Sequence, residues 1–220
     1  MDIVYQNKDF LVINKDNNLV IQKDNDGNSL EEILEKDALF PSLPRCGIVH
    51  RLDKQTTGTL LIAKNLPSLS FLTSLFKERK IKKVYLALLE GVLSVDSGEI
   101  KVNVQKIFSK NKIAMKKSEK KGKLAIVFFK VIERLKNFTF VEVYPFTGRT
   151  HQIRVAFKSI NHHIYNDPLY NNSHCEDKEI GQYLHAYSLK FLDNNNKERY
   201  FSSPLPGFFV NKLKSLGSKR

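Results

Sequence analysis

The chain contains little of what defines several common protein classes. It has two cysteines, Cys46 and Cys175, in 220 residues, with no CxxC pair and no disulfide-type spacing. This cysteine usage suits a reducing compartment and gives no structural zinc site. The longest apolar runs are far too short to span a bilayer, and the polar start MDIVYQNKDF does not resemble a secretory signal. We therefore expect a cytoplasmic protein with no membrane segment.

Acidic residues are also few relative to basic ones. Thirty-six Lys and Arg against 23 Asp and Glu give a formal net charge of +13. Such a balance favours a polyanionic partner, because each neutralised phosphate releases counterions. The most basic stretch, residues 105–123, is expected to form a solvated hairpin or loop, and its Lys116 and Lys117 are candidates for phosphate contacts. The alternative is an ordinary lysine-rich, solvated surface.

Several motifs of cofactor and metal chemistry are missing. The sequence has no GxxxxGK[ST], no GxGxxG, no HExxH and no HxE…PCxxC pattern. The histidines fit no common metal spacing. We expect no cofactor and no metal, so any chemistry must come from side chains acting on a polyanion.

Patterning predicts one domain over residues 1–220 with an α+β fold. Ser29 and Glu32 have the spacing of a capping box and predict a helix to about residue 39. Pro67 suits the start of a second helix, and residues 147–150 supply helix-start chemistry for a third. A short basic helix should follow Pro206. Strands are expected near residues 10–13, 60–63, 84–89, 138–143, 183–191 and 199–202.

The segment HRLDKQTTG at 50–58 places an isolated acid, Asp53, among bases just before an apolar run. In an arbitrary turn such an Asp most often hydrogen-bonds a nearby Thr in an Asx-type turn. Alternatively, the fold presents this carboxylate to something that reacts with it.

Five segments in fixed order decide between these interpretations. They are HRLDKQTTG at 50–58, KVYLALLEG at 83–91, GRTHQIRV at 148–155, NDPLY at 166–170 and LHAYSLKF at 184–191. Together they resemble the RluA-type family of RNA pseudouridine synthases over almost the whole chain. The resemblance implies a pseudouridine synthase fold: a mostly antiparallel mixed sheet, flanked by helices, with a basic central cleft. It also implies isomerisation of uridine to pseudouridine in structured ribosomal or transfer RNA, without cofactor or metal.

The resemblance assigns three catalytic residues. Asp53 matches the catalytic aspartate, which either attacks C1′ or removes the 2′ proton. Arg154 matches the arginine expected to pair with that aspartate and keep it charged. Tyr85 matches the active-site tyrosine that packs on the target base. Taken alone, Arg154 would be a surface cation and Tyr85 a core aromatic.

Further positions are expected to contact RNA. Arg51 matches a position that fills the gap left in the RNA stack, and Leu184 a wall of the apolar pocket. Arg149 and His151 belong to the GRTHQIRV motif. A solvated Arg51, a structural His151 and a core Leu184 are the alternatives.

Three departures from the family pattern stand out. Residues 14–18 read NKDNN where relatives often have NKPxG, which loses a stiffening proline. Ala156 stands where a histidine is common. Asn166 replaces a usual glycine, so the backbone there must avoid a glycine-only conformation. We also expect no N-terminal S4-type RNA-binding module before Phe10.

Two other functions compete with the isomerase. A non-catalytic RNA-binding protein could keep the fold and the basic cleft, but it would not need Asp53, Tyr85 and Arg154 together. DNA binding is weaker, because no helix-turn-helix, zinc-finger or basic-zipper signature is present. The sequence does not select the RNA or the uridine, and a monomer is the default expectation.

Overall fold

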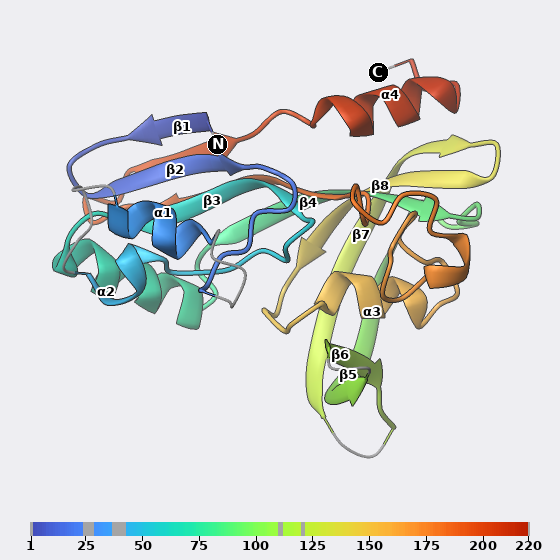
Figure 1. Cartoon of the computed structure of the whole chain (residues 1–220), viewed down its shortest axis with the longest axis horizontal. Helices are drawn as coiled ribbons and strands as arrows, with labels where there is room; N and C mark the ends of the chain where they lie inside the picture. Colours follow the sequence, from blue (N-terminus) through green and yellow to red (C-terminus); the bar gives the residue numbers. More distant parts are fainter. Residues whose placement is uncertain (1, 24–28, 37–42, 110–111, 120–121, 220) are drawn as a thin grey trace. The chain divides into compact units, whose positions relative to one another are not determined.

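The computed structural model describes residues 2–23, 29–36, 43–109, 112–119 and 122–219 (Figure 1). The chain divides into two compact units, of which the first comprises Met1–Lys83 and His185–Leu205 and the second Val84–Leu184 and Pro206–Arg220. The single domain over residues 1–220 therefore stays a prediction. The expected α+β class is confirmed, since short helices accompany sheets that are mostly antiparallel.

The first unit is built on a sheet with the neighbour order β1–β2–β3–β9, and β10 pairs with β9. Only the β3–β9 pair is parallel among the strand pairs described for this unit; the others are antiparallel. Its elements are β1 (Asp2–Gln6), β2 (Phe10–Lys15), α1 (Leu30–Lys36), a 3₁₀ turn (Pro44–Gly47), β3 (Thr57–Ala63), α2 (Leu66–Lys77), β9 (Leu184–Leu192) and β10 (Glu198–Ser202).

The core of the first unit lies between this sheet and α2. Apolar side chains of β2 and β3 meet Leu72 and Leu75 of α2, which lies alongside β3 in Figure 1. Asn65 caps α2 through its side chain, which accepts the Ser68 N–H at 2.9 Å, while Pro67 occupies the first turn. The expected helix start at Pro67 is thus confirmed to within one residue.

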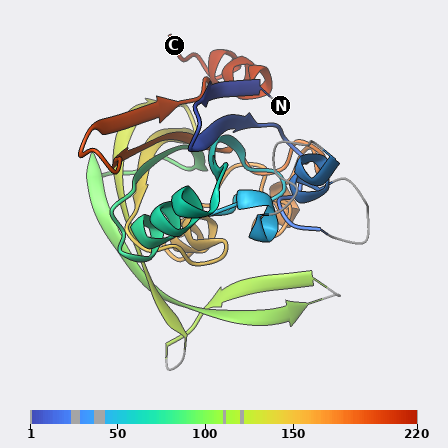
Figure 2. The same ribbon diagram turned by 90° about the vertical axis from the view of Figure 1, so that its left-hand side faces the viewer.

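The second unit carries an antiparallel sheet with the order β4–β8–β7–β5–β6. In Figure 2 the hairpin of β5 and β6 lies below the helix α3 of the same unit. The elements are β4 (Lys82–Glu90), β5 (Ser97–Ser109), β6 (Lys112–Lys117), β7 (Lys123–Leu135), β8 (Phe138–Pro145), α3 (Gln152–Lys158), a 3₁₀ turn (Asn172–His174) and α4 (Gly207–Ser215).

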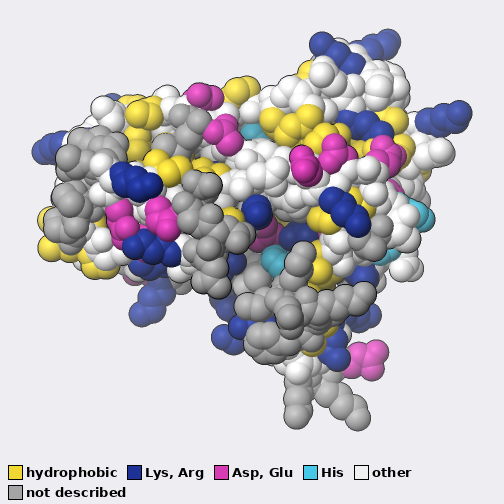
Figure 3. All heavy atoms as spheres, in the orientation of Figure 1, with side chains coloured by type: hydrophobic (Ala, Val, Ile, Leu, Met, Phe, Trp, Pro, Cys, Tyr) yellow, Lys and Arg dark blue, Asp and Glu magenta, His cyan; other side chains and the backbone are white. Residues whose placement is uncertain are grey.

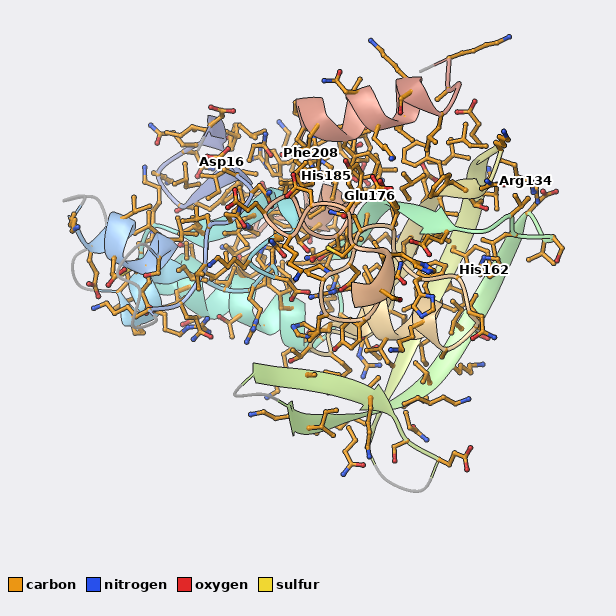
Figure 4. The ribbon with its side chains drawn as sticks, turned by 45° about the vertical axis from the view of Figure 1, so that its right-hand side comes forward. Asp16, Arg134, His162, Glu176, His185 and Phe208 are labelled. Atoms are coloured by element: carbon orange, nitrogen blue, oxygen red, sulfur yellow. The ribbon has the colours of Figure 1, made fainter. Side chains whose placement is uncertain are left out.

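Two helices pack on this second sheet. Phe157 of α3 meets Phe129 of β7 with ring centroids 5.6 Å apart, inside the main core cluster. Phe209 of α4 packs against Phe140 of β8 at 6.0 Å, and the neighbouring Phe208, labelled in Figure 4, meets Tyr183 edge-on at 5.4 Å. Aromatic contacts therefore fix the C-terminal helix to the second unit.

Most predicted elements are present, with shifts that have physical causes. The capping box holds: the Ser29 N–H donates to Glu32 Oε2 at 2.8 Å, and the Glu32 N–H to Ser29 Oγ at 3.2 Å. The helix is described to Lys36, and the expected end near residue 39 lies outside the described residues. The basic stretch forms the β5–β6 hairpin and continues into β7.

The helix expected from residues 147–150 was placed too early. Helix α3 begins at Gln152, and the preceding His151 has a left-handed backbone with φ of 50°. The Gln152 side chain explains the delay, because its Oε1 accepts both the Thr147 hydroxyl at 2.6 Å and the Arg149 N–H at 2.9 Å. Thr150 consequently lies outside the helix.

Within the described residues, no helix combines the length and apolar character needed to cross a bilayer.

Candidate active site

Asp53 lies on a short turn that leads into β3 of the first unit. Its carbonyl oxygen accepts the Thr56 N–H at 3.0 Å, which closes the turn, and β3 begins one residue later. Asp53 is half-buried. The preceding Leu52 is buried, whereas Arg51 and Lys54 are exposed. The turn therefore holds its acid at a partly accessible position, and it leaves Arg51 open to solvent.

A buried lysine supports this turn from the end of β2. Lys15 is completely buried, and its Nζ donates to the carbonyls of Asp16 at 2.8 Å, Leu19 at 3.0 Å and Lys54 at 2.9 Å. Burial lowers the pKa of Lys15 to about 7, although the negative charges of Asp53 and Asp16 oppose that shift. Lys15 and Asp53 therefore attract each other when both are charged.

His50, the first residue of the motif, is structural. Its Nε2 accepts the Leu61 N–H at 2.9 Å, and its ring stacks on Phe76 with centroids 4.5 Å apart. Burial of the ring, together with the positive charge of Lys83, lowers the pKa of His50 to about 3. The imidazole is therefore neutral and joins the turn to β3 and α2.

The end of the motif is fixed against β9. Thr57 Oγ1 lies 2.7 Å from Nδ1 of buried His185 (Figure 4), whose Nε2 lies 3.1 Å from the Ser203 carbonyl. Burial lowers the pKa of His185 to about 4. Because a carbonyl can only accept, Nε2 carries the proton of this neutral ring and Thr57 donates to Nδ1.

Gly58 makes the closest approach between these strands. Its φ is +112°, and a Cβ at this position would lie 2.3 Å from the carbonyl oxygen of Ala186. No other residue fits both the backbone conformation and the space. The final glycine of HRLDKQTTG is therefore a requirement of strand pairing.

In the second unit, Arg154 is held by a carboxylate that the sequence did not single out. Nε and Nη2 of Arg154 each lie 2.7 Å from an oxygen of Asp167, and the two side chains are 6% and 1% exposed. Asp167 Oδ1 also accepts the Leu169 and Tyr170 N–H groups, each at 2.9 Å. This two-pronged pair fixes the plane of the guanidinium. The predicted pairing of Arg154 with Asp53 stays a prediction, since the two residues belong to different units.

Tyr170 links α3 to the basic hairpin. Its hydroxyl accepts the Met115 N–H of β6 at 2.9 Å and lies 2.8 Å from His151 Nδ1. The Arg154 guanidinium carbon lies 5.0 Å from the centre of the same ring. The structure thus gives His151 a hydrogen bond within the protein, and its contact with RNA stays a prediction.

The other predicted positions also lie in the second unit. Tyr85 is half-buried on β4, opposite Val143 and packed against the core. Leu184 is buried in that core, and its place in a pocket wall stays a prediction. Lys116 and Lys117 are exposed on β6. Figure 3 shows Lys and Arg side chains in dark blue in the lower part of the view, where Figure 1 places β5 and β6.

Asn166 shows how the chain replaces the glycine that is usual in relatives. Its φ is 59°, in the left-handed region that asparagine tolerates better than other non-glycine residues. Its Nδ2 donates to the carbonyls of Asp177 at 2.7 Å and Gly181 at 2.8 Å, and its Oδ1 accepts the Asp177 N–H at 2.9 Å. The asparagine side chain therefore makes hydrogen bonds within the loop that a glycine at this position could not make.

Sequence reasoning missed the supporting residues Lys15, Asp167 and Tyr170. Each lies inside a quoted segment, but its partners are distant in sequence or are backbone atoms that leave no pattern. Among the described residues, no group of three His, Cys, Asp or Glu side chains is arranged to hold a metal ion.

A carboxylate on a braced turn, in an α+β fold with a basic hairpin, fits an enzyme that acts on nucleic acid. Comparison with known proteins identifies the class further. Residues 9–159 match the model of the RNA pseudouridylate synthase family. The chain belongs to this family, so the predicted family and enzyme class are confirmed.

Individual relatives agree with this assignment. An uncharacterized RNA pseudouridine synthase of Mycoplasma pneumoniae is 36% identical over 222 residues, which cover 100% of this chain and 71% of the relative. The ribosomal large subunit pseudouridine synthase D of Neisseria meningitidis serogroup B is 36% identical over 220 residues, covering 94% of this chain but only 58% of that protein.

Solved structures show the same fold. Human RNA pseudouridylate synthase domain containing 1 is similar with a TM-score of 0.76 and 29% identity, over 92% of this chain and 82% of the human chain. Human RNA pseudouridylate synthase domain containing 4 has a TM-score of 0.79 at 23% identity, over 97% of this chain and 92% of that one. The predicted pseudouridine synthase fold is thereby confirmed, whereas its basic central cleft stays a prediction.

Proposed function

We propose that this chain isomerises uridine to pseudouridine in ribosomal RNA, with Asp53 as the catalytic carboxylate. The observation that carries the proposal is the HRLD turn, which holds a half-buried Asp53 on a backbone tethered by Lys15. The family match includes this turn, and a relative is named for the large ribosomal subunit.

The reaction needs no net change in composition. The N1–C1′ bond of the uridine breaks, the uracil turns, and C5 bonds to C1′; the C5 proton is lost and N1 gains one. Asp53 either attacks C1′ or removes the 2′ proton, and both routes require an ionised carboxylate. Lys15 supplies a neighbouring cation when it is protonated, and its interaction with Asp53 is attractive.

The other predicted residues enter the proposal through the family resemblance. Tyr85 packs on the uracil, and Arg154 pairs with Asp53. Arg51 fills the gap in the RNA stack, with Leu184 in the pocket wall. The protein acts as a cytoplasmic monomer, without a cofactor or a metal.

Basic residues supply the RNA affinity that extrusion of a base requires. Arg149, His151, Lys116 and Lys117 are proposed to contact the RNA, and the two lysines are exposed on β6. Neutralised phosphates release counterions, so binding should weaken as salt rises.

Tritium release tests the assignment directly. Ribosomal RNA labelled at uridine C5 and lacking native modifications is incubated with the wild type, with Asp53→Asn and with Asp2→Asn. Asp2 is an exposed carboxylate on β1 and controls for the lost charge. We expect release by the wild type and by Asp2→Asn but none by Asp53→Asn, whose RNA affinity should stay nearly unchanged. Undiminished release by Asp53→Asn would remove this residue from the mechanism.

The competing function gives a different outcome. A non-catalytic RNA-binding protein would bind the RNA in a salt-dependent manner and release no tritium from ribosomal or transfer RNA. A DNA-binding protein would bind a DNA strand of matched sequence at least as well as the RNA.

A further inference from the structure

The sheet of the second unit has two faces with different neighbours. Side chains alternate along a strand, so Ala125, Val127 and Phe129 of β7 point to one face, where they join the core with α3. Leu124 and Phe128 point to the other face, which is called the outer face below. Figure 2 shows α3 on one side of this sheet only.

Helix α4 covers only one end of the outer face. Phe209 packs on Phe140 at that end. At the other end Phe128 is 42%, Phe146 50% and Leu124 45% exposed. Soluble proteins seldom leave adjacent large apolar side chains open unless the surface meets a partner.

These apolar side chains are neighbours across the sheet. Phe128 lies directly opposite Tyr144 of β8 in the strand register. The Phe146 N–H donates to the Ile126 carbonyl at 3.0 Å, so Phe146 lies diagonally from Phe128. Diagonal neighbours in a sheet are about 7–8 Å apart, which allows two rings to receive consecutive or alternate bases.

Basic side chains surround the rings. Lys101 of β5 lies opposite Ile126, and Lys130 lies opposite Glu142, so both point to the outer face. The Nε of Arg149 lies 3.3 Å from the Leu124 carbonyl at the edge of the same region. Two acids share this face: Glu99, opposite Phe128, pairs with Lys101 at 2.7 Å, and Glu142 accepts the Tyr144 hydroxyl. An RNA phosphate would therefore compete with Glu99 for Lys101.

We propose that this surface binds a single-stranded segment of the RNA substrate. The surface, called the outer-face patch, consists of Leu124, Phe128, Phe146, Lys101, Lys130 and Arg149. The exposed rings stack on bases, and the cations contact the backbone phosphates. A second copy of the chain is a poorer occupant, because a two-fold contact would set the same lysines against each other. The inference rests on the proposed function, since it takes RNA as the substrate.

The absence of tryptophan makes the patch easy to probe. Phe128→Trp introduces a single tryptophan, and Tyr200→Trp, at a 54% exposed position in the first unit, is the matched control. Short oligoadenylate is the ligand, since it contains no uridine that the catalytic turn could select. We expect oligoadenylate to quench the indole fluorescence of the Phe128→Trp variant and to change that of the Tyr200→Trp variant little.

Affinity is measured in parallel by fluorescence anisotropy. Phe128→Ala together with Phe146→Ala should weaken oligoadenylate binding by at least about tenfold. Lys101→Gln with Lys130→Gln should instead reduce the salt dependence of binding. Unchanged affinity in the phenylalanine variant, or equal quenching in the two tryptophan variants, would overturn the proposal. So would a concentration-dependent dimer that only the phenylalanine variant abolishes.

The tritium assay separates this proposal from the proposed function. If the wild type releases tritium while the Phe128→Trp variant is not quenched, the patch fails and the isomerase stands. If the Phe128→Trp variant is quenched while the wild type releases no tritium, the patch is an RNA surface and the isomerase assignment fails.

Discussion

Lys15 offers a test of how the turn that carries Asp53 is held. Its pKa falls from 10.5 to about 7 because the ammonium group is buried. This difference corresponds to roughly 5 kcal/mol by which the fold disfavours the charged form relative to the neutral one. The three carbonyls that Nζ contacts recover part of that cost.

The sign of the pH dependence follows from proton binding. Between pH 7 and about 10.5 the unfolded chain keeps the Lys15 proton while the folded chain loses it. Because the unfolded state binds more protons, the free energy of unfolding rises with pH across this window. From pH 7 to pH 10 the contribution is roughly 3–4 kcal/mol.

Lys15→Met removes this titration and keeps a side chain of similar length. Urea unfolding of both proteins at pH 7 and at pH 10 gives the difference in their free energies of unfolding. We expect this difference to move in favour of the wild type by several kcal/mol at the higher pH. Since Lys54 loses its tether, turnover should also fall more than RNA affinity does. An equal difference at both pH values would refute a lowered Lys15 pKa.

Three further substitutions test other contacts. Asp167→Asn leaves the buried Arg154 without its carboxylate and should cost about 3–5 kcal/mol in urea unfolding. Tyr170→Phe removes the hydroxyl that bridges α3 and β6 and should cost about 1–3 kcal/mol, with faster amide exchange in β6. Gly58→Ala puts a Cβ against the Ala186 carbonyl and should lower the free energy of unfolding by roughly 3 kcal/mol or more.

Each of these three substitutions has a matched control substitution at an exposed position of the same chain. Asp96→Asn breaks an exposed pair with Arg134, Tyr200→Phe alters an exposed hydroxyl, and Gly148→Ala adds a Cβ with nothing within 4 Å. These three should change stability little. A buried substitution that proved no more costly than its control would contradict the structural role assigned to it.

Local chemistry carried much of the prediction from sequence. The capping box at Ser29 and the helix beginning near Pro67 depend on side chains three residues apart or on one fixed φ angle, so they are visible in a short window. The strand β1 was not predicted, because its residues are mostly exposed and lack a clear alternation. The start of α3 was misplaced because Gln152 reaches back to Thr147 and overrides the helix-start pattern.

The candidate site divides in the same way. Asp53, Arg154 and Tyr85 could be singled out from motifs, because a motif is recognised by residue type and order alone. The carboxylate partner of Arg154 could not be predicted in this way. Asp167 is thirteen positions away, and only the folded second unit brings the two side chains together. Asn166 was expected to avoid a glycine-only conformation, but only the structure shows that its φ is 59°, a left-handed value that asparagine tolerates.

The sequence alone determined the family, the α+β class, the basic character and the residue types at the proposed site. These follow from composition and from ordered motifs. Tertiary structure decided that Lys15 is buried against the turn that carries Asp53 and that His185 is neutral and hydrogen-bonded to Thr57. It also decided that one face of the second sheet keeps its phenylalanines exposed. Each of these depends on which distant groups meet and on how much water they lose, and a linear pattern encodes neither.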